Sequence, residues 1–146
     1  MPLVFAGACS HAPGITGRAD RADPVLRDGL YEGFDRMRRA IEESGAEALV
    51  VIGAEHFANF FMDNMPAFCI GMGETYTGPI EDEAWLGIKR TQISGAPDLS
   101  RRLITNIMNE IDVAYAQEWQ FDHGIMVPLH FLTPRYDMPV IPVNIN

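Results

Sequence analysis

The sequence has 146 residues, of which 47% are hydrophobic and 21% are charged, and this composition is typical of one globular domain. Its formal net charge of −9 argues against nucleic acid as a partner, because phosphate binding needs clustered Lys and Arg. No apolar run is long enough to cross a membrane, and the N-terminus lacks the pattern of a signal peptide. Two cysteines do not make a disulfide framework, so we expect a cytoplasmic protein.

The first third of the chain predicts a strand–helix–strand unit. Residues 2–8 are apolar throughout, which predicts a strand buried on both faces. A helix follows, with Asp23 as its N-cap, Pro24 as its first residue and Gly45 just past its end. Its apolar residues recur at helical spacing, so we expect one helix face to pack on a sheet. A second buried strand over residues 47–53 would complete a right-handed parallel crossover.

The rest of the chain predicts shorter elements. Residues 67–71 indicate a strand, and residues 72–96 are compatible with a hairpin or a short helix. The final segment contains two prolines, which favour an edge or bulged strand. Together these patterns predict an α/β fold with a central mixed or mostly parallel sheet flanked by helices. The other expected elements are a helix near 98–111, a strand near 113–117, a helical turn near 125–132 and a strand near 139–145.

Three histidines, His11, His56 and His123, each follow a predicted strand. Open α/β sheets collect functional residues at the carboxyl ends of their strands, so we expect these side chains to share one site. Imidazole is the commonest protein ligand for zinc, copper and non-haem iron. The resulting hypothesis is a mononuclear metal site held by His11 and His56, with His123 as an acid–base group beside it.

Each histidine also has a structural interpretation. A histidine that follows a strand is often a surface or capping residue, and His123 beside Gly124 suits either an acid–base group or a solvated turn. His130 lies within an apolar run and is interpreted as structural or partly exposed. Glu55 is a weak candidate for a metal ligand, because it and its neighbour His56 would point to opposite faces of a strand.

Two further groups of residues lie near the histidines or between them in the sequence. Phe57, Phe60 and Phe61 are expected to belong to the core or to line an apolar slot for an aromatic ring. The acidic run over residues 81–83 is expected to form a solvated surface.

Several segments of the sequence together resemble the class III extradiol ring-cleavage dioxygenases, the protocatechuate 4,5-dioxygenase beta-subunit superfamily. The resemblance spans nearly the whole chain, and its long middle segment and its Asp-His-Gly segment are the most specific parts. The matching segments are residues 9–13 (CSHAP), 49–56 with 59–71, 122–124 (DHG), 128–132 (PLHFL) and 139–146.

The resemblance implies that His11 and His56 bind Fe(II) and that His123 transfers protons. It implies extradiol cleavage of a catechol-type aromatic compound by O2, in the breakdown of aromatic compounds. No segment matches the family's third iron ligand, a glutamate, or its second acid–base histidine. Residues 1–146 therefore resemble the amino-terminal part of the catalytic domain, and we expect a homo-oligomer or a second polypeptide that completes the site.

Two other functions fit the same residues. A non-catalytic scaffold or subunit of the same superfamily would explain the missing carboxylate ligand. A zinc-dependent hydrolase is the third reading, because histidine combined with a carboxylate also suits zinc.

Overall fold

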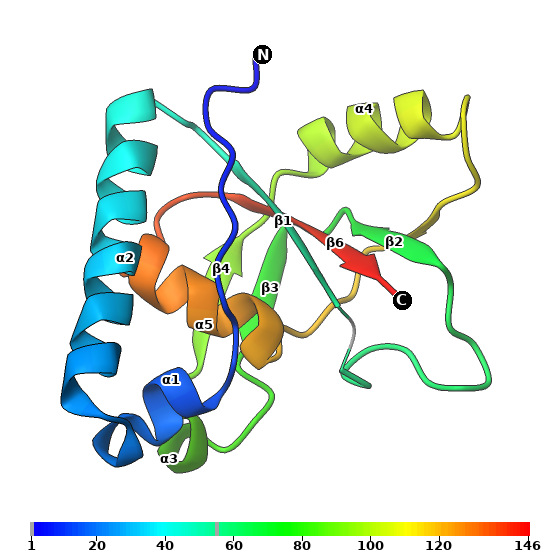
Figure 1. Ribbon diagram of the computed structural model, residues 1–146. Helices are drawn as coiled ribbons and strands as arrows, with labels where there is room; N and C mark the ends of the chain where they lie inside the picture. The colour runs from blue at the N-terminus through cyan, green and yellow to red at the C-terminus, as the bar shows by residue number, and fades with distance from the viewer. Residues whose placement is uncertain (1, 55) are drawn as a thin grey trace.

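The computed structural model describes residues 2–54 and 56–146. A four-stranded mixed sheet has the strand order β1-β6-β2-β5, and β3 and β4 form a separate antiparallel pair (Figure 1). Within the described ranges, no helix has the length and apolar character that a membrane span requires. The elements are α1 (Gly14–Gly17), η1 (Ala19–Arg21), α2 (Pro24–Ser44), β1 (Leu49–Ala54), β2 (Phe68–Gly71), β3 (Thr75–Gly78), α3 (Glu83–Leu86), β4 (Thr91–Ser94), α4 (Pro97–Ile107), β5 (Ala114–Ala116), α5 (His123–Leu132) and β6 (Val140–Ile145).

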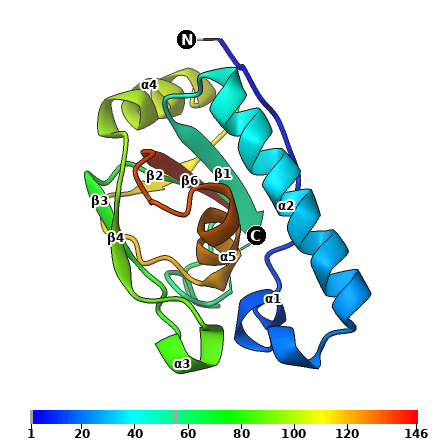
Figure 2. The same ribbon diagram turned by 90° about the vertical axis from the view of Figure 1, so that its left-hand side faces the viewer.

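Helices α4 and α5 cover opposite faces of the four-stranded sheet (Figure 2). Successive residues of a strand point to opposite faces, so neighbours belong to different cores. Cys69 and Val140 pack with buried residues of α5, whereas Ile70 and Ile141 pack with Ile104 of α4. The predicted α/β class, with a mixed sheet flanked by helices, is therefore confirmed.

The long helix α2 has the predicted ends but not the predicted neighbour. The Asp23 carboxylate accepts hydrogen bonds from two backbone N–H groups of the first turn, and Gly45 ends the helix with φ 68°. We expected α2 to pack on a sheet, but it packs on α5. The Phe34 and Phe131 rings stack with their centroids 4.4 Å apart. The reason is that α5 is apolar on nearly all sides and contacts both α2 and β1.

The prediction of a strand over residues 2–8 is wrong in this structure, and so is the strand–helix–strand unit built on it. The segment has no strand assignment, and Leu3 is 87% exposed. A strand needs a neighbour for its backbone groups, and within the described residues this segment pairs with none.

Strand β1 occurs where it was predicted, but it is not buried on both faces. It is the edge of the sheet and pairs with β6 alone, and Ile52 is 63% exposed. Along β1, half-buried residues on the α5 side alternate with exposed residues on the other side, where the core beneath α4 includes no residue of β1.

The last strand, β6, was predicted at an edge, but it lies between β1 and β2 and is buried. Its antiparallel pairing with β2 includes Val143 opposite Ile70 and stops before Pro142. A side chain on Gly71 would collide with the Pro142 ring. The glycine therefore provides the space that lets a proline occupy a central strand.

The region 72–96 contains both of the structures that its composition allowed. Strands β3 and β4 pair antiparallel, and the short helix α3 lies between them in the sequence. Helix α4 ends at Ile107, earlier than predicted, and Ile111 is exposed.

Candidate metal centre

The structure brings His11, His56 and His123 together from three separate parts of the chain. His11 precedes α1, His56 follows β1 and His123 is the first residue of α5. The centroid of the His56 ring lies 4.4 Å from that of His123 and 5.1 Å from that of His11. The His11 and His123 centroids are 6.1 Å apart. Among the described strands, β1 ends two positions before His56, whereas none ends just before His11 or His123, so the three histidines do not converge from three strand ends as expected.

A carboxylate fixes the orientation of the His56 ring. Nδ1 of His56 lies 2.8 Å from Oδ2 of Asp122, which is buried. The other oxygen of Asp122 accepts a hydrogen bond from the backbone N–H of Gly124 at 2.9 Å, so Asp122 is also the N-cap of α5. Because an ionised carboxylate can only accept, this contact favours the proton on Nδ1, and in the neutral imidazole Nε2 then has the lone pair.

Gly124 allows this arrangement to be compact. A Cβ atom at this position would lie 2.9 Å from Cε1 and 3.0 Å from Nδ1 of His56. It would also lie 2.9 Å from Oδ1 of Asp122. The start of α5 therefore forms a cradle that admits the His56 ring only because no side chain is present there.

A second carboxylate holds His123. Oε1 of Glu81 lies 2.7 Å from Nδ1 of His123 and accepts the backbone N–H of the same residue at 2.9 Å. The Glu81 side chain is only 17% exposed. The acidic run was expected to be a solvated surface, and for Glu81 this expectation is wrong. Glu81 lies 42 positions from His123 in the sequence, so no local pattern could reveal the contact.

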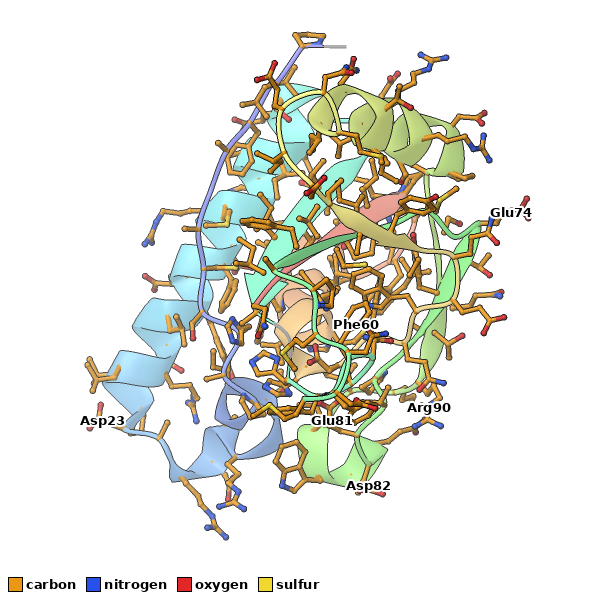
Figure 3. All side chains as sticks on the ribbon, turned by 90° about the vertical axis from the view of Figure 1, so that its right-hand side faces the viewer. Asp23, Phe60, Glu74, Glu81, Asp82 and Arg90 are labelled. Carbon is orange, nitrogen blue, oxygen red and sulfur yellow. The ribbon has the colours of Figure 1, made fainter. Side chains whose placement is uncertain are left out.

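The other two acidic residues of the run serve local structure. Asp82 caps the N-terminus of α3 by accepting the backbone N–H of Trp85. Glu83 accepts the backbone N–H of Arg90. Glu81, Asp82 and Arg90 are labelled in Figure 3, which shows them around the start of α3.

The surroundings favour the neutral form of His11. Burial lowers the pKa of its imidazole below the ordinary 6.5, and repulsion from His56 and His123 lowers it further. The carboxylate of Asp122 acts in the opposite direction. A neutral imidazole is the form that binds a metal ion, so the electrostatic environment suits a ligand.

The donor atoms present fit a transition metal. Ligand atoms of His56, Asp122 and His123 all lie within 4.8 Å of one another, and the His11 ring borders this group. Both Asp122 oxygens already accept hydrogen bonds, so the atoms left to coordinate a metal are imidazole nitrogens. Imidazole suits iron, zinc, copper and nickel, and a carboxylate on the far nitrogen of a ligating histidine is a recurrent feature of metal sites. Glu55, the other acidic candidate, lies outside the described residues.

The three phenylalanines do not form one wall. Phe60 is partly buried and packs against Trp119 with ring centroids 5.9 Å apart, whereas Phe57 and Phe61 are exposed. Figure 3 shows Phe60 among the side chains that fill the interior. The pattern of three aromatic residues therefore divides into one core residue and two surface residues.

The fold is an α/β domain with a mixed sheet, and the histidines beside that sheet are held by carboxylates. This combination defines a candidate metal-dependent enzyme domain. The sequence profile described as the catalytic LigB subunit of aromatic ring-opening dioxygenase matches residues 6–146, and the chain belongs to this LigB family. The resemblance seen in the sequence is thereby confirmed.

Curated relatives extend this comparison. The chain is 34% identical over 139 residues to a 2,3-dihydroxyphenylpropionate/2,3-dihydroxicinnamic acid 1,2-dioxygenase of Klebsiella pneumoniae, and 33% identical to the enzyme of that name from Escherichia coli strain 55989. Each match covers 94% of this chain and 42% of the relative, so the chain spans less than half the length of these enzymes. A crystal structure of an uncharacterized Escherichia coli K12 protein superposes with a TM-score of 0.49 at 21% identity, over 77% of this chain and 39% of that chain.

Proposed function

We propose that residues 1–146 are the amino-terminal part of the catalytic domain of an Fe(II)-dependent extradiol dioxygenase, which opens a catechol-type ring with O2. The observation that carries this proposal is the convergence of His11, His56 and His123 in a chain of the LigB family. The names of the relatives support a dihydroxylated aromatic substrate.

In this proposal His11 and His56 hold the metal. The contact with Asp122 favours the proton on Nδ1 of His56 and so would leave Nε2 for the ion, and burial favours the neutral form of His11. Bound Fe(II) supplies a template and an electron conduit between the aromatic substrate and O2. The position of His56 is fixed by the end of β1 and, through Asp122, by the start of α5.

His123 is the proposed acid–base group. Its Nδ1 is engaged by Glu81, so Nε2 is the nitrogen that accepts a proton from a substrate hydroxyl or returns one to a reacting oxygen. The His123 ring lies next to the His56 ring, which supports a role beside the proposed ion. Of the three phenylalanines we propose Phe57 as a contact for the aromatic ring, because it is exposed and directly follows His56 in the sequence.

Metal titration tests the ligand assignment. We expect wild-type protein to bind Fe(II) under anaerobic conditions, and His11→Ala and His56→Ala to lose that binding. His130→Gln is the matched control, because this histidine packs against Phe131 and is outside the cluster. Unchanged Fe(II) binding by both alanine variants would overturn the assignment.

A non-catalytic member of the superfamily is the second candidate, and one observation favours it. Both oxygens of Asp122 accept hydrogen bonds, and Glu81 contacts Nδ1 of His123 through one oxygen, so we assign neither carboxylate as the third ligand. We propose that a further part of the protein, or a second polypeptide or copy, contributes that ligand. Fe(II)-dependent O2 uptake with 2,3-dihydroxyphenylpropionate, measured on the whole protein, separates the candidates. Uptake would exclude both a scaffold and a zinc-dependent hydrolase.

A further inference from the structure

The contact between Glu81 and His123 has an unusual form, because one carboxylate oxygen accepts two hydrogen bonds from one residue. Oε1 accepts the backbone N–H of His123 at 2.9 Å and lies 2.7 Å from its Nδ1. The two bonds fix both the position of the residue and the rotation of its ring. We infer that Glu81 is a positioning residue, which holds His123 in the tautomer with the proton on Nδ1 and the lone pair on Nε2. This inference rests on the proposed role of His123.

The segment that carries Glu81 is itself held in place. The backbone N–H of Ile80 donates to the carbonyl of Phe121, two residues before His123, at 2.9 Å. From the other side, the Arg90 guanidinium donates to the carbonyls of Pro79 and Ile80. The segment that carries Glu81 is therefore hydrogen-bonded to the segment that carries His123, which keeps the carboxylate and the ring at a fixed separation.

The second oxygen of Glu81 indicates that stability alone does not explain the residue. Oε2 is buried and has no hydrogen-bond partner among the described residues. A buried, unpartnered carboxylate oxygen costs folding free energy, whereas an exposed glutamate in this acidic run would cost none. A role in orienting His123 gives a physical reason for placing the carboxylate there.

Proton transfer by His123 requires that one tautomer of its ring be selected. A neutral imidazole accepts a proton only on the nitrogen that lacks one, so the wrong tautomer presents a donor where an acceptor is needed. When Nε2 of His123 takes a proton, the carboxylate of Glu81 already faces the positive charge that forms. Asp122 has the same relationship to Nδ1 of His56, so the site uses two carboxylates to set two imidazoles.

Nitrogen-15 NMR of the histidine rings tests the inference without requiring activity. At a pH where the imidazoles are neutral, we expect wild-type His123 to show one tautomer, with Nδ1 protonated. Glu81→Ala should give a mixture of tautomers, while the rings of the other histidines keep their wild-type signals. Glu74→Ala, at an exposed glutamate just before β3, is the control and should leave His123 unchanged. A His123 ring that keeps the Nδ1–H tautomer in Glu81→Ala would overturn the inference.

A kinetic measurement on the whole protein adds a second readout and covers a failure of Glu81→Ala to fold. Glu81→Gln keeps the shape of the side chain but removes its charge, and we expect kcat to fall about 10- to 100-fold with KM nearly unchanged. Glu81→Asp should recover part of the loss. Wild-type kcat in Glu81→Gln, or no recovery by Glu81→Asp, would count against the inference. If the wild-type protein shows no turnover, the proposed function fails, and the NMR result still decides the role of Glu81.

Discussion

The imidazole of His56 and the carboxylate of Asp122 are 66 positions apart in the sequence and 2.8 Å apart in space, measured between Nδ1 and Oδ2. The same carboxylate caps α5, so one side chain joins the end of β1 to the start of a helix. The position of a proposed metal ligand is thereby tied to the integrity of that helix terminus.

Replacing Asp122 should weaken metal binding more than it weakens the fold. Asp122→Asn retains an oxygen that can cap α5, but its amide nitrogen cannot accept the proton of His56 Nδ1. We expect a loss of about 10- to 100-fold in Fe(II) affinity, measured by anaerobic titration. Asp23→Asn, at the N-cap of α2, is the control and should leave the affinity unchanged. Equal affinities for wild type and Asp122→Asn would show that Asp122 serves only as a cap.

Adding a methyl group at Gly124 should displace His56. The new Cβ would approach ring atoms of His56 to 2.9 Å, and we expect Gly124→Ala to lower the free energy of unfolding by about 1–3 kcal/mol and to reduce Fe(II) binding. Gly29→Ala is the comparison, because Gly29 lies within α2 with open space around it and should gain up to about 1 kcal/mol. Urea unfolding of both variants measures the difference. If Gly124→Ala left the free energy of unfolding unchanged or raised it, the claim that the His56 ring needs a glycine at this position would be wrong.

Removing the His123 imidazole should separate metal binding from turnover. In the whole protein, we expect His123→Ala to retain Fe(II) and to lower kcat by about 10²–10⁴-fold, the range typical of a lost acid–base group. Metal analysis of the purified variant and O2 uptake with a catechol measure the two properties. Loss of iron together with activity would instead make His123 a ligand, and wild-type turnover would remove it from the mechanism.

Stability should fall as the pH decreases below the ordinary pKa of histidine. Burial lowers the pKa of His130 from 6.5, so over an interval just below this value the unfolded chain binds a proton that the folded chain does not. The free energy of unfolding therefore rises with pH across that interval, and the contribution of His130 is lost as the pH falls. His11 contributes with the same sign. Urea unfolding between about pH 5 and 7 should show this slope, and His130→Gln should reduce it. An unchanged slope in His130→Gln would contradict the assigned cause.

The sequence by itself determined the features that depend on neighbouring residues. Asp23 and Gly45 define the ends of α2 through contacts within one helical turn, and both were predicted correctly. The family resemblance was also readable, because it depends on residue identity along the chain. The same information named His11, His56 and His123 as candidates before any distance between them was known.

The tertiary structure alone decided which residues support those histidines and where the strands lie. Glu81 looked like part of a solvated acidic run, yet it contacts His123. Pro142 in the sequence predicted an edge strand, yet β6 lies in the middle of the sheet, because Gly71 has no side chain to collide with the proline ring. Residues 2–8 have the composition of a strand but no neighbour to pair with among the described residues. Capping and periodicity act within a few residues, whereas strand order and side-chain partners depend on which distant segments pack together.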